Sequence, residues 1–402
     1  MSETPGYWRD PYQVDLETEV VEIGTDPDGR PWAILADTIL YPEGGGQPCD
    51  LGSIDDVPVT GVLRARGRTI HLLDRALVLG PARVRLDWDR RYDHMQQHTA
   101  QHLLTAVAED RVGWPTTAFH LGSEVSDVEL GVSRIAEEEL RDLEGAVAVG
   151  VGGALAVGER RTTVEEMAAA GARCRGLPEG LEGEVRLVEI QGVDLAACGG
   201  THLRSTAEIE CVCLLDTGAL RGGTRVHFVA GGRVRHRMAR HETRNAGLRT
   251  VLGAPDEELT TAAAAKLEQL QAVGRAQKRL TADLGAALAR ALAASDEAVV
   301  AHHLEVGGQE LLQAVARQLT SLGFTGLALL TSGGGHFALV SGEESPHLPE
   351  LGRMVAEVLG GKGGGAGRQF QGKADAIHRH AEAFEKLRLA AANLSAGRPG
   401  GG

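Results

Sequence analysis

Aromatic residues and cysteines are scarce in this 402-residue chain. Phe, Trp and Tyr together make up only 3% of it, and its five cysteines are Cys49, Cys174, Cys198, Cys211 and Cys213. Their spacing is not that of a disulfide scaffold, which favours a reducing compartment. No stretch approaches the roughly 20 apolar residues of a membrane span, and the first residues, MSETPGYWRDPY, form no signal segment. We therefore expect a cytoplasmic protein that has no membrane partner.

An excess of positive charge is missing as well. The chain has 41 Lys and Arg against 55 Asp and Glu, a formal net charge of -14. Because binding to phosphates needs positive charge, this balance excludes a protein that coats nucleic acid indiscriminately. Local contacts are still possible, and arginine, the main basic residue, suits phosphate. Two clusters are candidates for RNA contact or are simply solvated surface: Arg221, Arg225, Arg233, Arg235, Arg237 and Arg240, and then Lys362, Arg368 and Lys373 in a Gly-rich loop.

Glycine, by contrast, is abundant at 54 residues, and the hydrophobic pattern changes along the chain. Short alternating runs between Gly/Pro turns come first and predict a small β-barrel or sandwich. Helical and strand patterns then mix, so the fold class that we expect is α+β. The expected parts are a β-barrel-like subdomain at 1–88, an α+β domain at 89–245, a helical spacer or dimerisation segment at 246–295, an α/β domain at 296–395 and a disordered tail at 396–402.

Residues 255–294 predict one long helix or a helical hairpin, because only isolated glycines interrupt them after Pro255. Leu280, Leu284, Leu288 and Leu292 repeat every fourth residue. Such a stripe is typical of a spacer or of the seam of a homodimer. The C-terminal domain is a second candidate for a dimer contact.

Two histidine-containing motifs predict a metal site. In HTAQHLL, His98 and His102 are four residues apart in a helical pattern, so both imidazoles can reach one ion. In DLAACGGTHL, Cys198 and His202 have the same spacing, but the two glycines between them indicate a loop. Three imidazoles and one thiolate suit a tetrahedral Zn²⁺ ion. His94 extends the histidine row but is left out, because zinc sites on helices rarely use three successive turns.

These two motifs resemble those of the editing domain of alanyl-tRNA synthetases and of the free-standing AlaX editing proteins. Three further segments are similar to the same family, in the order of the long form of AlaX: YPEGGGQPCDLGSI, GARCRGLPEGLEGEVRLVEI and GGKGGGAGRQFQGKAD. The last of them also resembles the C-terminal domain of DHH-type phosphoesterases. Since the β pattern starts near residue 12, we expect no counterpart of the synthetases' aminoacylation domain. The resemblance therefore implies an enzyme that edits tRNA but does not charge it.

The resemblance also implies a reaction and a site. The reaction is the zinc-dependent hydrolysis of the ester that joins serine, or else glycine, to tRNA of the alanine type. The implied zinc ligands are His98, His102, Cys198 and His202. The implied amino-acid pocket is bordered by Gly44, Gly45, Gly46 and Gln47. The candidate catalytic residues are Gln47, Thr201 and His120, the last at a polar position where synthetases often have Gln.

Several alternatives follow from the same residues. Four protein ligands are typical of structural zinc, whereas catalytic zinc usually keeps an open position, so zinc would either activate water or only orient substrate. Thr201 or the backbone near Gly45 and Gly46 would read the serine hydroxyl, a stronger discriminator than size. The alternative functions are a non-catalytic, zinc-stabilised module that binds tRNA or protein, and another metal-dependent hydrolase such as a phosphoesterase. Against the latter, AHHLEV at 301 lacks the aspartate of an Asp-His-His run.

Overall fold

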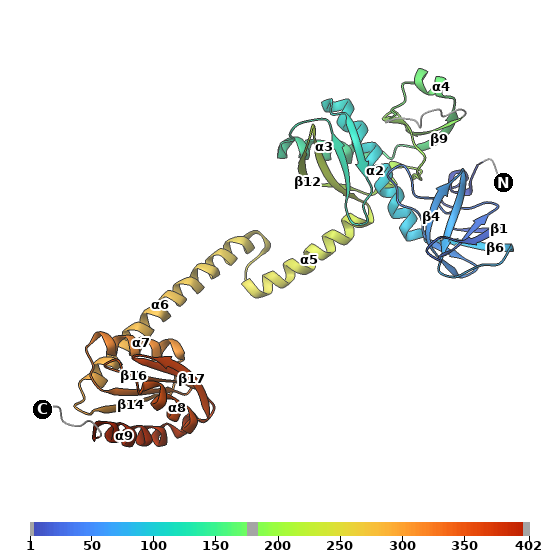
Figure 1. The fold of residues 1–402 in the computed structure, drawn as a ribbon. Coiled ribbons are helices and arrows are strands. Elements are labelled where there is room, and N and C mark those ends of the chain that lie inside the picture. The colour runs from blue at the N-terminus through green and yellow to red at the C-terminus, as the bar shows by residue number, and fades with distance from the viewer. Residues whose placement is uncertain (1–3, 175–183, 397–402) are drawn as a thin grey trace. The chain divides into compact units, whose positions relative to one another are not determined.

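The computed structural model describes residues 4–174 and 184–396, which form two compact units, Met1–Gly247 and Leu248–Gly402 (Figure 1). Each unit has hydrophobic cores of its own. The finer division expected from the sequence, with a separate spacer, stays a prediction. Residues 175–183 of the family-like segment GARCRGLPEGLEGEVRLVEI and nearly all of the expected tail at 396–402 lie outside the described residues.

The N-terminal unit begins with a short helix, α1 (Gly6–Arg9), and a closed six-stranded barrel with the strand order β1-β2-β5-β4-β3-β6. The strands alternate between buried and exposed positions, as a barrel with a filled interior requires. This confirms the barrel among the expected alternatives. The strands are β1 (Asp15–Thr25), β2 (Pro31–Leu35), β3 (Gly52–Ile54), β4 (Val57–Ala65), β5 (Arg68–Leu73) and β6 (Gly80–Leu86).

A long helix, α2 (Trp88–Val112), follows the barrel and crosses the core of the unit. The Asp87 side chain caps it by accepting a hydrogen bond from the Arg90 N–H, and Gly113 ends it in the left-handed region. Every residue from 94 to 106 is buried, so this middle part of α2 is surrounded by protein on all sides. This position places both histidines of the first motif in the interior.

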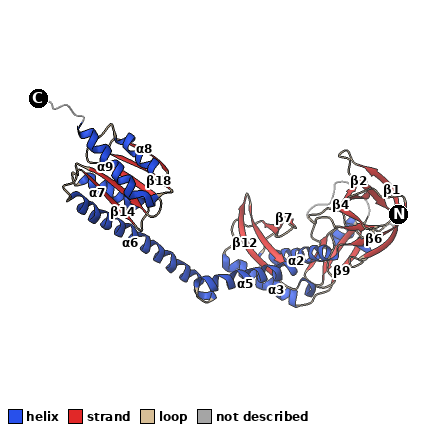
Figure 2. Ribbon diagram, turned by 90° about the horizontal axis from the view of Figure 1, so that it is seen from below, coloured by secondary structure: helices blue, strands red, loops and turns tan. Residues whose placement is uncertain are grey.

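Two further sheets and the helix α3 pack against α2 (Figure 2). One sheet has the order β12-β13-β8-β7 and the other β11-β10-β9. Leu103 of α2 packs with Leu143 and Val147 of α3 in the main core. The elements are β7 (Thr116–His120), β8 (Ser126–Leu130), α3 (Glu137–Gly152), β9 (Val157–Thr162), α4 (Val164–Ala169), β10 (Val185–Ile190), β11 (Asp194–Ala197), β12 (Val212–Leu220) and β13 (Gly223–Ala230).

The C-terminal unit is an α/β sandwich around a sheet of order β14-β15-β16-β18-β17. Only β14 and β15 are parallel, joined by the crossover helix α7. Leu329 faces the core under α8 and α9, whereas Leu330 faces the core under α6 and α7. The elements are α6 (Leu259–Ala293), β14 (Val299–Leu304), α7 (Gln309–Ser321), β15 (Leu327–Ser332), β16 (His336–Ser341), α8 (Leu348–Val358), β17 (Gly361–Ala366), β18 (Gln369–Ala374) and α9 (His380–Ala396).

The structure differs from the sequence reading in the helices near the unit boundary. The basic stretch after β13 is a helix, α5 (Gly232–Leu252), and the boundary between the units falls within it. Every residue of α5 is at least partly exposed, so it has no apolar stripe by which to recognise it. Of the two alternatives for 255–294, α6 is a single helix rather than a hairpin. No helix among the described residues is both long and apolar enough to cross a membrane.

The Gly-rich segment near the C-terminus was expected as a loop and is instead an antiparallel hairpin of β17 and β18. Lys362 and Lys373 are direct cross-strand partners in it, and Arg368 lies in the turn. Glycine is required here because side chains would collide with the facing strand: a Cβ on Gly361 would lie 2.1 Å from the carbonyl oxygen of Lys373. Gly361, Gly363 and Gly365 therefore serve close strand contact, whereas Gly364 has open space around it.

Candidate metal centre

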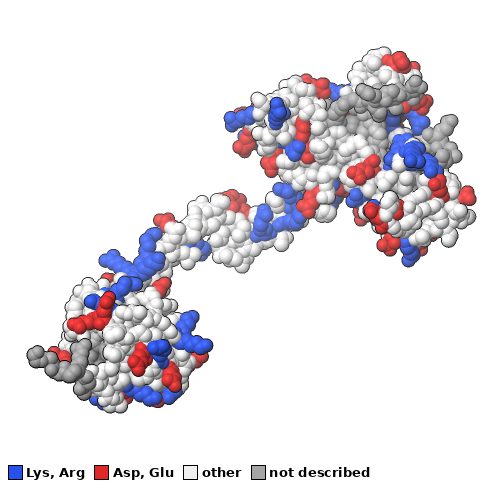
Figure 3. Space-filling model, in the orientation of Figure 1, with Lys and Arg blue, Asp and Glu red and all other residues white. Residues whose placement is uncertain are grey.

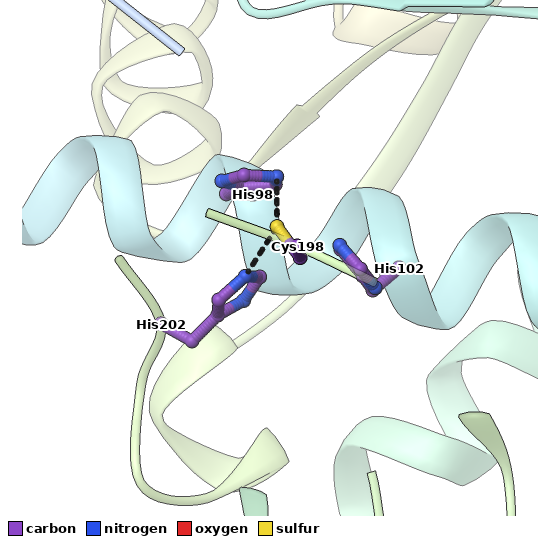
Figure 4. A group of neighbouring side chains, drawn as sticks. All are labelled: His98, His102, Cys198 and His202. Carbon is purple, nitrogen blue, oxygen red and sulfur yellow. Dashed lines mark hydrogen bonds between the residues drawn. The ribbon is translucent and has the colours of Figure 1, made fainter. Parts of the chain in front are cut away.

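The two sequence motifs meet inside the N-terminal unit. His98 and His102 project from α2, and Cys198 and His202 from the loop that follows β11 (Figure 4). One ligand atom of each residue lies within 4.8 Å of those of the others. Cys198 Sγ is 3.3 Å from His202 Nε2 and 3.5 Å from His98 Nε2. His94, one turn earlier on α2, is outside this group.

The donor atoms fit a zinc ion. The Nε2 atom of His102 is buried and has no hydrogen-bond partner within the described part of the chain. A buried polar atom without a partner is costly, and a metal ion bound by the four residues would supply one. The set of three imidazoles and one thiolate is one that tetrahedral zinc accepts.

Each imidazole is held through its other nitrogen. His98 Nδ1 lies 2.9 Å from Gln47 Oε1, His102 Nδ1 lies 2.8 Å from Asp194 Oδ2, and His202 Nδ1 lies 3.2 Å from Thr99 Oγ1. Where Nδ1–H donates to such an oxygen, Nε2 keeps its lone pair for a ligand bond. All three Nε2 atoms are thereby directed into the same pocket.

Charge in the pocket is set by competition between burial and neighbours. Burial alone would raise the pKa of Cys198, but the surrounding imidazoles hold it well below its ordinary value. Burial also opposes protonation of His102, yet the Cys198 thiolate and the Asp194 carboxylate raise its pKa to about 9. Burial lowers the pKa of His202 to about 3. The neighbouring imidazoles thus favour the thiolate of Cys198, which is the form of cysteine that binds metal.

The loop that carries Cys198 is fixed by its carbonyl oxygens. Arg186 Nη1 donates to the carbonyls of Cys198 (2.9 Å) and Gly200 (2.8 Å). Trp8 Nε1, in α1, donates to the carbonyl between them, that of Gly199, at 2.7 Å. The Arg186 guanidinium also lies 5.7 Å from the centre of the Trp8 ring. Three consecutive peptide groups are therefore tied down from outside the loop.

The structure places the Gly-rich element of the predicted pocket beside this centre. Gly44 to Gln47 form a tight turn with reciprocal hydrogen bonds between Gly44 and Gln47, and Gly45 and Gly46 have positive φ angles of 57° and 80°. The three glycines are exposed, whereas Gln47 is buried. A Cβ on Gly46 would lie 2.8 Å from the ring of Phe119, so the turn packs closely against β7. The only polar surface that the turn offers is its backbone.

Gln47 and Thr201, predicted as catalytic, are buried and bonded to each other. Gln47 Nε2 donates to Thr201 Oγ1 at 2.9 Å, and Gln47 Oε1 accepts from the Thr201 N–H at 3.0 Å as well as facing His98. Both side chains thus hold the ligand loop and one ligand in register. In this arrangement they position the candidate ligands.

His120, the third catalytic candidate, lies apart from the four ligands at the end of β7. Its side chain is 61% exposed, and its Nδ1 atom is 3.2 Å from Asp127 Oδ1. Glu129 is close enough to complete a second group of possible ligand atoms with these two residues. Arg225 forms ion pairs with both Asp127 and Glu129, so this group is already neutralised in part.

The predicted RNA contacts differ in how free their charges are. Arg225 is engaged with two carboxylates, whereas Arg221 is exposed in the turn between β12 and β13. Lys362, Arg368 and Lys373 are all exposed on the hairpin of the C-terminal unit. The hairpin therefore presents three positive charges to solvent, while the first cluster presents fewer than its sequence suggests.

Sequence reasoning missed the residues that hold the ligands. Asp194, Thr99, Arg186 and Trp8 belong to four separate segments, and they act through contacts made only in the folded chain. The closest signal was positional, since Thr99 follows His98 and Asp194 precedes Cys198 by four residues. No spacing rule pointed to Arg186 or Trp8.

Part of the chain matches a class of domain found in tRNA synthetases. The family model described as the threonyl and alanyl tRNA synthetase second additional domain matches residues 185–249, which include Cys198 and His202. Two alanyl-tRNA editing proteins are similar to this chain over most of its length. The alanyl-tRNA editing protein Aarsd1 of Mus musculus is 34% identical over 93% of this chain and 95% of its own length, and that of Danio rerio is 31% identical over 97% and 98%.

The chain belongs to the family of alanyl-tRNA editing proteins. Alanine–tRNA ligase of Pyrococcus abyssi is also similar, with 27% identity over 95% of this chain but only 43% of the ligase. Among solved structures, RecJ of Thermus thermophilus matches 36% of this chain and 23% of its own with 18% identity and a TM-score of 0.26, a likeness too low to bear on fold or function.

Proposed function

We propose that this chain is a zinc-dependent deacylase that acts in trans on mischarged tRNA of the alanine type. The preferred substrate is the seryl ester, with the glycyl ester as the second candidate, and the proposed location is the cytoplasm. The observation that carries the proposal is the convergence of His98, His102, Cys198 and His202 next to an exposed Gly-rich turn. The family relationship supplies tRNA as the partner of its editing members.

Different groups of the chain would have different roles in the proposed reaction. Zinc held by these residues would supply Lewis acidity toward the ester carbonyl, or toward a bound water, if one ligand leaves or the ion becomes five-coordinate; with all four ligands in place it would only orient the substrate. Gln47, Asp194 and Thr99 hold the three imidazoles in one orientation. The exposed backbone of Gly45 and Gly46 is better placed than the buried Thr201 to read a serine hydroxyl. A site that hydrogen-bonds this hydroxyl rejects alanine by about 10⁴-fold, which size alone cannot achieve.

The direct test uses purified chain with seryl-tRNA and alanyl-tRNA of the alanine type. We expect selective loss of the seryl ester, abolished by a chelator and restored by zinc. His102→Ala is expected to remove the activity, and Glu189→Gln, an exposed change on the neighbouring β10, to leave it intact. Equal stability of both esters would refute the deacylase and favour the non-catalytic module. Release of phosphate from nucleotides instead would favour the phosphoesterase.

A second experiment separates the two roles of zinc. Cys198→Ala, loaded with zinc and checked for metal content, retains the three histidines. Full activity of this variant would remove Cys198 from any essential role and favour an ion that needs only histidine ligands to activate water. Loss of activity with zinc still bound would assign the thiolate a part in the reaction.

His120 is proposed to act on the substrate from the rim of the site. Its exposure and its contact with Asp127 would orient the imidazole toward solvent. His120→Gln, which restores the residue common at this position in synthetases, is expected to keep most of the activity, and His120→Ala to lose it. Wild-type rates for both variants would leave His120 without a catalytic role.

The C-terminal unit is proposed to contribute to tRNA binding through its hairpin and to self-association through α6. Several apolar residues on α6 follow helical spacing and are 47% to 69% exposed; they are Leu267, Leu270, Val273, Leu280 and Leu284. A second copy of α6 would cover this row in the manner of a coiled coil. Sedimentation of the wild type and of Leu270→Glu/Leu280→Glu tests this: a dimer that the variant dissociates is expected, and a wild-type monomer refutes it.

A further inference from the structure

We propose that one face of α5 binds the phosphate backbone of RNA. The inference rests on the proposed function for the identity of that RNA as the substrate tRNA. In a chain of net charge -14, this one helix contains six arginines and a single acidic residue, Glu242. Every residue of α5 is at least partly exposed, so the helix is not there to fill a core. Because a helix without a buried face contributes little to core packing, its charged side chains are candidates for binding a partner.

The structure sorts the six arginines into two groups. Arg233 pairs with Asp93 at 2.7 Å, Arg235 with Glu210 at 2.6 Å and Arg249 with Asp256 at 2.7 Å. These three fasten the ends of the helix to their own units. The side chains of Arg237, Arg240 and Arg244 form no ion pair or hydrogen bond with any other described residue, and the last two are exposed.

The three unpaired arginines lie in one row. Their spacing of three and four residues puts them on the same face of the helix. At 1.5 Å per residue, the row is about 10 Å long. Figure 3 shows basic side chains over α5. A row of planar, permanently charged guanidinium groups is suited to successive phosphates of a nucleic-acid strand. It lacks the apolar centre of a protein interface.

The row is held at a fixed position relative to the metal centre. The side chain of Gln97, next to His98, donates to the Ala230 carbonyl and accepts from the Ala230 N–H, both at 2.9 Å. The side chain of Gln96 accepts from the Gly232 N–H at 3.0 Å. Gly231 between them has a positive φ of 56°, and a Cβ there would lie 2.1 Å from the Gln96 side chain. The start of α5 is thus locked to the turn of α2 that carries the ligands. One RNA molecule can then reach both at a constant spacing.

The test is the salt dependence of tRNA binding, measured by fluorescence anisotropy with uncharged tRNA of the alanine type. The triple variant Arg237→Gln/Arg240→Gln/Arg244→Gln is expected to bind at least tenfold more weakly at low salt. Its log K against log [salt] slope should be smaller by about two to three, since each lost phosphate contact removes about 0.7 to 0.9. The triple Lys variant keeps the charges and should keep the slope. Arg141→Gln, an exposed change on α3, is the matched control and should behave as wild type.

The outcomes separate this inference from the proposed function. Because uncharged tRNA is used, binding is measured whether or not the chain hydrolyses an ester. A wild-type slope for the Gln variant overturns the inference, and so does an equal loss for Arg141→Gln. Glutamine is nearly as good a helix former as arginine, and circular dichroism confirms that α5 is intact. A row that binds tRNA in a chain that leaves seryl-tRNA untouched would refute the deacylase alone.

Discussion

At the scale of single residues, the metal centre depends on which nitrogen each imidazole presents. Gln47, Asp194 and Thr99 occupy the Nδ1 atoms, so Nε2 of each histidine faces Cys198. Such supporting contacts usually change metal affinity by 10- to 100-fold when they are removed. The ligands are therefore only part of what makes the site.

The two glycines of the ligand loop offer a matched pair of substitutions. A Cβ on Gly200 would lie 2.2 Å from His98 Cε1 and 2.7 Å from Gln47 Oε1, whereas one on Gly199 would meet nothing closer than Trp8 at 3.9 Å. We expect Gly200→Ala to weaken zinc binding at least tenfold and Gly199→Ala to leave it near wild type. Competition with a chromophoric chelator measures both. Equal affinities for the two variants would show that the loop is not packed as described.

A buried histidine in the barrel predicts a pH dependence of stability. Burial lowers the pKa of His71 to about 4, against about 6.5 when exposed, and Thr38 and Ala33 hold the neutral ring. As pH falls from 6.5 toward 4, the unfolded chain takes up a proton that the folded one refuses. His71 therefore destabilises the fold by up to roughly 1.4 kcal/mol per pH unit over this window, and its effect is absent above it.

Urea titrations followed by tryptophan fluorescence measure this effect, because all four tryptophans belong to the N-terminal unit. His71→Gln has no proton to gain and is expected to show a flatter loss of stability between pH 6.5 and 4 than the wild type. Identical slopes for the two proteins would mean that His71 already carries its proton in the folded state or is not buried.

At the scale of elements, the ligand loop is positioned by groups that lie outside it. Arg186→Lys cannot reach the carbonyls of Cys198 and Gly200 with the same fork, and Trp8→Phe loses the N–H that binds Gly199. We expect both variants to bind zinc less tightly and to lower kcat more than they raise KM. Arg160→Lys on β9 is the control for an exposed arginine. Unchanged zinc affinity in both variants would contradict this positioning role.

The elements also show what could be predicted from the sequence. The alternating strands of the barrel and the convergence of His98, His102, Cys198 and His202 followed from periodicity, spacing and family resemblance. The helix α5 did not, because it has no buried face, and the hairpin β17–β18 was taken for a loop because its glycines serve close strand contact. The partners Asp194 and Arg186 are set by tertiary contacts, which local patterns do not contain.

At the scale of the whole molecule, the barrel and the helix α2 are joined by a fully buried ion pair. Arg91 Nε lies 3.1 Å and 3.0 Å from the two carboxylate oxygens of Asp50, and the same guanidinium donates to the carbonyls of Pro11 and Ile39. Removing one partner of such a pair leaves a buried charge uncompensated, which typically costs about 3–5 kcal/mol.

Asp50→Asn is therefore expected to destabilise the N-terminal unit by about that amount in urea titrations, with the barrel and α2 unfolding in one transition. Asp56→Asn, which breaks the exposed pair with Arg85, should change stability by less than about 1 kcal/mol. Two separate transitions, or similar effects of both changes, would show that the barrel and α2 are not coupled through this pair.

The central claim is that ligands about a hundred residues apart in the sequence bind one zinc ion, and X-ray absorption at the zinc edge of the zinc-loaded chain tests it most directly. The account predicts a four-coordinate ion with one sulfur at about 2.3 Å and nitrogens at about 2.0–2.1 Å, with the sulfur absent in Cys198→Ser. A zinc environment without sulfur in the wild type, or a chain that binds no stoichiometric zinc, would contradict it.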